Sequence, residues 1–235
     1  MSDGKSAALP RIASSLALLG VLATGCATAQ GAEGVRSAEP APNLSDLKKS
    51  IVDYHDSGRW DADIARADRR GQDYLARRLA QGVSKPAIVL DIDETSLSTY
   101  GYETEHDFGY DKAEYDEYVL AREATGIAAT RDLVRFADAH GVAVFFVTGR
   151  RESPRMRDAS TQDLREEGYP EFDGLYLRPV YDHDPSVVPY KSGARADIER
   201  QGYRIILNIG DQDSDLAGGH AERGVKLPNP MYKVN

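Results

Sequence analysis

The sequence has a single cysteine, Cys26, among its 235 residues, so no disulfide bond can form within one chain. It has no run of eighteen apolar residues, which excludes an ordinary membrane-spanning helix. Basic residues are also scarce, because 29 lysines and arginines stand against 38 aspartates and glutamates, for a net charge of -9. So acidic a chain is a poor partner for a nucleic-acid backbone, although a local lysine or a bound cation can still attract a small phosphorylated ligand into a cleft.

The N-terminal residues have the order of an export signal. Lys5 and Arg11 form a short basic region, and a largely apolar run follows over residues 12–23. This order is typical of a secretory leader. Small residues before Cys26 resemble a bacterial lipoprotein cleavage box, in which Cys26 would carry the lipid and anchor the protein to the cell membrane. The alternative is ordinary signal cleavage after residue 29, which would leave a freely secreted protein.

We therefore expect a signal peptide over residues 1–29 and a flexible linker over residues 30–44. The linker is rich in Ala, Gly, Pro and Glu, which do not form a hydrophobic core. About 190 residues remain, which suits one α/β domain with a modest insertion. Apolar segments that favour strands alternate with segments whose periodicity favours helices, and this alternation predicts a parallel, doubly wound sheet. The expected strands are 87–90, 142–147, 174–177 and 204–209; the expected helices are 43–54, 61–81, 129–140, 154–167 and 191–201.

Residues 96–126 do not fit this alternation. A structureless loop of about 30 residues would be unusual, so we predict a small helical cap inserted after the first strand. The segment holds six aromatic residues, which are Tyr100, Tyr102, Phe108, Tyr110, Tyr115 and Tyr118. They could simply form the core of the cap, or some could line a pocket and stack on the organic group of a substrate.

Two carboxylates follow the first predicted strand. Its apolar run leads directly into Asp91 and Asp93, and open α/β sheets bind ligands at the C-terminal ends of their strands. Carboxylates that lie close together repel one another, so such an arrangement indicates a bound cation or a reaction that uses them. The pattern therefore favours metal-assisted phosphoryl transfer with an aspartate nucleophile. The alternative is an acidic cluster that holds a structural cation.

Three further polar groups follow later strands. Thr148 and Gly149 offer a hydroxyl and backbone N–H groups that suit a phosphate. Lys191 precedes a predicted helix, and Asp211 and Asp215 come after the last strand. Each group by itself is weak evidence, since ordinary turns, solvated lysines and exposed acids are common. Because all of them follow predicted strands in the right order, we expect them to form one site at one edge of the sheet.

The segment Asp91-Ile92-Asp93-Glu94-Thr95 resembles the first signature, Asp-x-Asp-x-Thr, of the haloacid dehalogenase (HAD) superfamily. The order of the later groups, and the terminal segment 226–232, resemble the secreted acid phosphatases of that superfamily. These comprise the class B and C enzymes and the plant acid phosphatases and vegetative storage proteins of subfamily IIIB. The resemblance covers roughly residues 45–235. It implies a Rossmann-like core whose helical cap shapes substrate choice.

The resemblance also implies a function. The protein would be an exported, Mg²⁺-dependent acid phosphatase that hydrolyses small phosphate monoesters through an aspartyl-phosphate, with nucleotides among the candidate substrates. In this assignment Asp91 is the nucleophile and Asp93 the general acid and base. Thr148 and Gly149 contact the phosphate, and Lys191 holds the phosphate and Asp91 by charge. Many relatives carry Asn at the position of Gly149, so the resemblance assigns no side-chain role there.

By the same resemblance, the Mg²⁺ ligands are Asp91, the backbone carbonyl of Asp93, and Asp211. Asp215 would act on the metal site through water or Lys191. Asp213 is expected to face solvent, and the terminal segment 226–232 is assigned a structural role. Some plant relatives have lost the nucleophile. The alternative is therefore a catalytically weak or inactive storage or ligand-binding protein on the same scaffold.

Overall fold

The computed structural model describes residues 41–234, so Cys26, the predicted leader and most of the predicted linker lie outside the described part. The helices are α1 (Leu44–Asp56), α2 (Arg59–Ala80), α3 (Tyr100–Glu105), α4 (Lys112–Ala121), α5 (Ala128–Ala139), α6 (Pro154–Glu166), α7 (Val188–Arg200) and α8 (Asp213–Leu216). The strands are β1 (Pro86–Leu90), β2 (Leu97–Ser98), β3 (Thr125–Gly126), β4 (Ala143–Arg151), β5 (Gly174–Arg178), β6 (Arg204–Gly210) and β7 (Arg223–Lys226).

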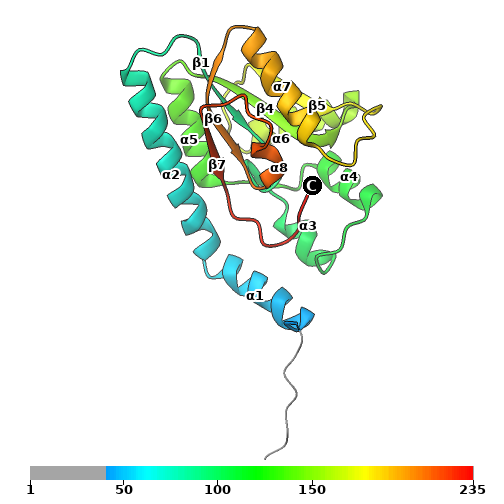
Figure 1. Cartoon of the computed structure of the whole chain (residues 1–235). Helices are drawn as coiled ribbons and strands as arrows, with labels where there is room; N and C mark the ends of the chain where they lie inside the picture. Colours follow the sequence, from blue (N-terminus) through cyan, green and yellow to red (C-terminus); the bar gives the residue numbers. More distant parts are fainter. Residues whose placement is uncertain (1–40, 235) are drawn as a thin grey trace, which may run out of the picture. The chain divides into compact units, whose positions relative to one another are not determined.

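The central sheet has five strands in the order β5-β4-β1-β6-β7, and every neighbouring pair is parallel. The predicted α/β class with a doubly wound parallel sheet is confirmed. Figure 1 shows α2 and α5 on one side of the sheet and α7 on the other. Strand β7 was not predicted, because Val225 is the one apolar residue in its sequence Arg-Gly-Val-Lys. It lies at the edge of the sheet, where a strand pairs on one side only.

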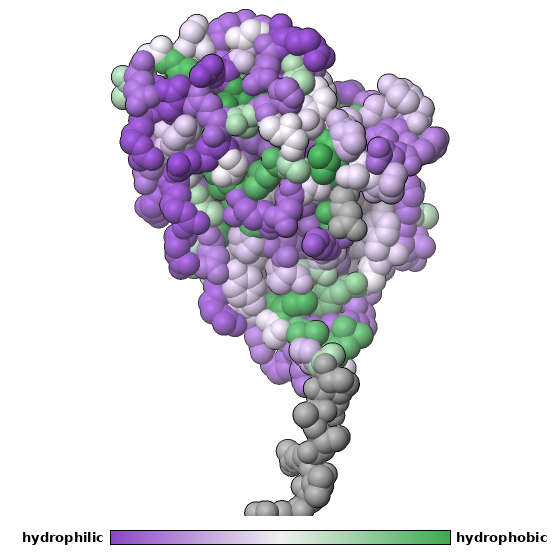
Figure 2. Space-filling model, viewed as in Figure 1, coloured by the Kyte–Doolittle hydropathy of each residue, from purple (hydrophilic) through white to green (hydrophobic). Residues whose placement is uncertain are grey.

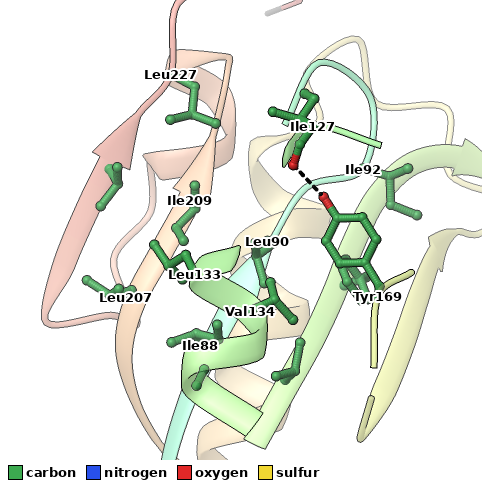
Figure 3. Close-up of a cluster of buried hydrophobic side chains, with 14 of the residues drawn as sticks. Ile88, Leu90, Ile92, Ile127, Leu133, Val134, Tyr169, Leu207, Ile209 and Leu227 are labelled. Atoms are coloured by element: carbon green, nitrogen blue, oxygen red, sulfur yellow. Dashed lines mark hydrogen bonds between the residues drawn. The ribbon is translucent and has the colours of Figure 1, made fainter. Parts of the chain in front are cut away.

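Strand β1 is buried on both faces, which explains why its sequence is continuously apolar rather than alternating. Ile88 and Leu90 face the core cluster that contains Leu133 of α5, and Figure 3 shows these side chains packed beside one another. Ala87 and Val89 face the opposite cluster, which α7 covers. A strand buried on both faces needs apolar residues at every position. Asp91 directly follows this buried central strand, which therefore fixes its position.

Residues 96–126 contain α3 and α4 between the short strands β2 and β3, which pair antiparallel and close the base of the insertion. Tyr102 is 1% exposed and packs edge-on against Tyr115, with ring centroids 5.1 Å apart. Its hydroxyl donates to the carbonyl of Asp111, at 3.0 Å. Part of the aromatic content of this segment is thus a small core of its own, as one of the two interpretations predicted.

Within residues 41–234, no helix is both long and apolar enough to cross a bilayer. Figure 2 shows a largely hydrophilic face with scattered apolar side chains, some of them toward the end where α1 lies. Leu44 and Leu47 of α1 are among the exposed large apolar residues.

A carboxyl group is buried where α2 packs on α5. Asp68 is 2% exposed, and the hydroxyl of Thr130 donates to its Oδ2 at 2.8 Å. Its Oδ1 has no hydrogen-bond partner among the described residues. Burial raises the pKa of Asp68 to about 7, and the hydrogen bond from Thr130 offsets only part of this effect. The folded protein therefore keeps a proton that the unfolded chain releases at about pH 4.

We expect this group to lower stability as the pH rises from about 4 to 7, because the unfolded state binds fewer protons over that range. Asp68→Asn should remove this contribution. The difference in the free energy of unfolding, variant minus wild type, should increase by about 2–4 kcal/mol between pH 4 and pH 8. Urea denaturation of both proteins at a series of pH values measures the difference. Equal pH dependence in the two proteins would contradict the assignment.

Candidate active site

A cavity of about 560 Å³ opens at the C-terminal edge of the central strands. Six of the seven predicted site residues in the described chain line it, namely Asp91, Asp93, Gly149, Lys191, Asp211 and Asp215. Thr148 is the exception, since it is fully buried in β4 and is not among the lining residues of the described part. Its Oγ1 accepts a hydrogen bond from the backbone N–H of Arg150, at 3.2 Å.

Lys191, near the start of α7, connects two of the aspartates. Its Nζ lies 2.9 Å from Oδ1 of Asp91 and 2.5 Å from Oδ1 of Asp215. Burial alone would disfavour the ammonium, but these two carboxylates outweigh that effect and raise the pKa of Lys191 above its ordinary value. The side chain therefore stays charged and holds Asp91 and Asp215 in place.

Three buried carboxylates meet at this point. Asp91, Asp211 and Asp215 each offer an oxygen atom, and these atoms lie within 4.8 Å of one another. Burial raises the pKa of Asp91 well above its ordinary value; Asp215 and Asp211 add to the rise, and Lys191 opposes it. Burial, then Asp215, also raises the pKa of Asp211 to about 6. The cluster thus has more negative charge than Lys191 neutralises.

This donor set fits a divalent cation. Oδ1 of Asp91 is buried and, among residues 41–234, no donor meets it in hydrogen-bond geometry, although Lys191 is close. Hard divalent cations prefer a few carboxylate oxygens with water completing the shell. A cation at the cluster would relieve the repulsion among the three carboxylates.

Asp93 lies two residues from Asp91 and is bound by Arg150, whose role the sequence did not assign. The guanidinium makes a two-pronged contact, with Nη2 at 2.6 Å from Oδ1 and Nε at 3.1 Å from Oδ2 of Asp93. Nη1 of Arg150 donates to the hydroxyl of Ser160 at 2.9 Å. The position of Arg150 in β4, two residues after Thr148, is a sequence signal for this role.

The backbone around the aspartates is unusual at two places. Glu94 has φ +54° and is fully buried, and its Oε1 accepts from both the N–H and the hydroxyl of Thr99. Gly210 ends β6 so close to Asp215 that a Cβ there would lie 2.4 Å from that of Asp215. Only glycine permits this approach, which brings Asp215 back to Lys191.

The insertion supplies one wall of the cavity. Phe108, Tyr110 and Tyr115 line it together with Glu103. Some of the aromatic residues thus line a pocket, as the second interpretation predicted, and Tyr115 belongs both to this wall and to the small core. Stacking on a substrate stays a prediction. Burial and the nearby Asp93 raise the pKa of Tyr115 well above its ordinary value, which keeps the phenol neutral. Burial raises the pKa of Glu103 to about 7. The wall therefore combines aromatic surface with a few polar groups.

The C-terminal segment contributes more than the structural role predicted for it. Tyr232, Lys233 and Val234 line the cavity, and the side chain of Asn229 donates to Asp211. The sequence offered no periodicity that would have found these residues. Asp213 is exposed, as predicted.

The chain resembles plant proteins and a bacterial enzyme. Acid phosphatase 1 of Solanum lycopersicum is 36% identical over 150 residues, which are 62% of this chain and 58% of that protein. A stem 28 kDa glycoprotein of Glycine max is 35% identical over 169 residues, 69% of this chain and 66% of that protein. The chain thus spans slightly less than two thirds of the length of each of these two relatives.

The fold also matches the class C acid phosphatase from Bacillus anthracis, with a TM-score of 0.67 and 24% identity, over 81% of this chain and 86% of that one. At this identity the likeness supports the fold alone. A family comparison covers more of the chain than the plant relatives do. Residues 17–235 match the family described as HAD superfamily, subfamily IIIB (acid phosphatase), and the chain therefore belongs to that family.

Proposed function

We propose that this protein is an exported, Mg²⁺-dependent acid phosphatase that hydrolyses small phosphate monoesters. One observation carries the proposal: the carboxylate of Asp91, 2.9 Å from Lys191, lies in a cavity wide enough for a small ester. A buried carboxylate with an adjacent ammonium suits attack on a phosphoryl group whose charge must be neutralised. Membership of the acid phosphatase family supports the same reaction.

In the first step, a carboxylate oxygen of Asp91 attacks phosphorus, and the bond from phosphorus to the alcohol oxygen breaks. Asp93 gives a proton to the departing alcohol. In the second step, water attacks the aspartyl-phosphate and Asp93 takes a proton from it, which releases inorganic phosphate and restores Asp91. Arg150 holds the carboxyl of Asp93 through its two-pronged contact. Lys191 stabilises negative charge on the transferred group.

Mg²⁺ would be held by Asp91, Asp211 and the backbone carbonyl of Asp93, and would supply positive charge for the phosphoryl oxygens. Asp215 would support this site through Lys191, which it contacts at 2.5 Å. Gly149 would offer its backbone N–H to the phosphate, and the hydroxyl of Thr148 would help to define that corner. The aromatic wall of the cavity supports esters with a flat organic group, nucleotides among them.

The same proposal includes export. A signal peptide over residues 1–29, with a lipid on Cys26, would place the enzyme on the outer side of the cell membrane at the end of a flexible linker. Freely secreted protein is the alternative form.

Hydrolysis of 4-nitrophenyl phosphate by the full chain tests the activity. With Mg²⁺ we expect turnover, and with excess chelator we expect a loss of at least about 100-fold, because the carboxylate cluster would be left with uncompensated charge. Readdition of Mg²⁺ should restore the rate, whereas Ca²⁺, which prefers more ligands at longer distances, should not.

A folded protein without turnover from acidic to neutral pH would instead favour a storage role. Vegetative storage protein 1 of Arabidopsis thaliana is 29% identical over 150 residues.

A further inference from the structure

The segment after β7 returns across the candidate active site and is firmly anchored. The backbone N–H of Leu227 donates to the carbonyl of Gly210 at 2.9 Å, and its side chain is fully buried in the core that Figure 3 shows. The indole of Trp60 donates to the carbonyl of Pro228 at 3.0 Å. These contacts place the next residue, Asn229, beside the buried aspartates.

The carboxamide of Asn229 has one possible orientation. Its Oδ1 accepts from the backbone N–H of Met231 at 2.8 Å, so its Nδ2 is the end that faces Asp211. That nitrogen donates to Oδ2 of Asp211, also at 2.8 Å. The contact joins two residues that are 18 positions apart.

Two other donors complete the surroundings of Asp211. Nε2 of Gln212 donates to the same Oδ2 at 2.6 Å, while its Oε1 accepts from the backbone N–H of Val234 at 3.0 Å. The hydroxyl of Thr95 donates to Oδ1 at 3.1 Å. With both of its oxygens engaged, the carboxylate of Asp211 cannot rotate without losing hydrogen bonds in a buried place.

We propose that Asn229 is a positioning residue, which orients the carboxylate of Asp211 for the divalent cation. The inference deepens the proposed function and rests on its metal site. Groups that hydrogen-bond to a ligating carboxylate fix its direction, and their loss typically weakens metal binding by about 10–100-fold. Through Asn229, the C-terminal segment becomes part of the metal site.

The test is titration calorimetry of the metal-free full chain with Mg²⁺ alone, so the reading does not depend on turnover. Asn229→Ala should bind Mg²⁺ at least about 10-fold more weakly than the wild type. Ser214→Ala is the matched control, because its hydroxyl donates to the carbonyl of Val234 at 3.1 Å and so secures the same segment without itself donating to Asp211. It should bind Mg²⁺ within about twofold of the wild type.

Kinetics add a second reading. In Asn229→Ala, kcat at saturating Mg²⁺ should stay close to that of the wild type, while the Mg²⁺ concentration for half-maximal rate rises by the same factor as the dissociation constant. Unchanged Mg²⁺ affinity in Asn229→Ala would overturn the inference, as would an equal loss in Ser214→Ala, or a wild type that binds no Mg²⁺. A third outcome is that the wild type binds Mg²⁺, Asn229→Ala binds it more weakly, and the wild type hydrolyses no ester. That outcome would support the inference and overturn the proposed function.

Discussion

Asp91→Asn should lower the rate of phosphate ester hydrolysis by at least about 1,000-fold, because an amide cannot attack phosphorus and form the covalent intermediate. The substitution keeps the size of the side chain, so the cavity should keep its shape. A chromogenic aryl phosphate, assayed with saturating Mg²⁺, measures the loss. Residual activity within tenfold of the wild type would show that Asp91 is not the nucleophile.

The stability of the same variant separates chemistry from folding. Asp91 shares one buried cluster with Asp211 and Asp215, and burial together with these neighbours raises its pKa well above the ordinary value. A neutral amide removes part of this repulsion, while Lys191 keeps its contact with Asp215. Without metal, at pH 8, Asp91→Asn should therefore be at least as stable as the wild type to urea. A clearly less stable variant would leave misfolding as the cause of inactivity.

Asp93→Asn should lower turnover of an alkyl phosphate by about 100- to 10,000-fold, because a poor leaving group needs a proton as it departs. Arg150 would still contact the amide oxygen, so the side chain should stay in place. A 4-nitrophenyl ester behaves differently, since its phenolate leaves without a proton. The first step should then remain fast while the attack of water on the intermediate becomes slow.

Rapid mixing of Asp93→Asn with 4-nitrophenyl phosphate should accordingly give a burst of nitrophenolate equal to the amount of enzyme, followed by slow turnover. Asp213→Asn, which changes an exposed aspartate outside the cavity, is the matched control and should behave as the wild type. Equal losses on both esters with no burst would contradict the assignment of Asp93 as acid and base.

Several features could be predicted because the information is local. The strand 87–90 had to be buried on both faces, since each of its residues is apolar, and a polar residue directly after such a strand lies at the edge of the sheet. Asp91 and Asp211 could be placed together in this way, whereas Lys191, which lies in α7, was assigned from its order in the chain and the family resemblance. Strand β7 and the reach of the insertion could not, because Arg223–Lys226 has little apolar pattern and the aromatic residues of 96–126 suit a core and a cavity wall equally.

The sequence by itself thus determined the class of fold, the edge of the sheet where the candidate site lies, and the four aspartates there. Only the tertiary structure decided which neutral and cationic side chains orient them. Arg150 reaches Asp93 across 57 positions and Asn229 reaches Asp211 across 18. Periodicity reports which face of one element is buried, whereas these contacts depend on how separate segments pack against one another.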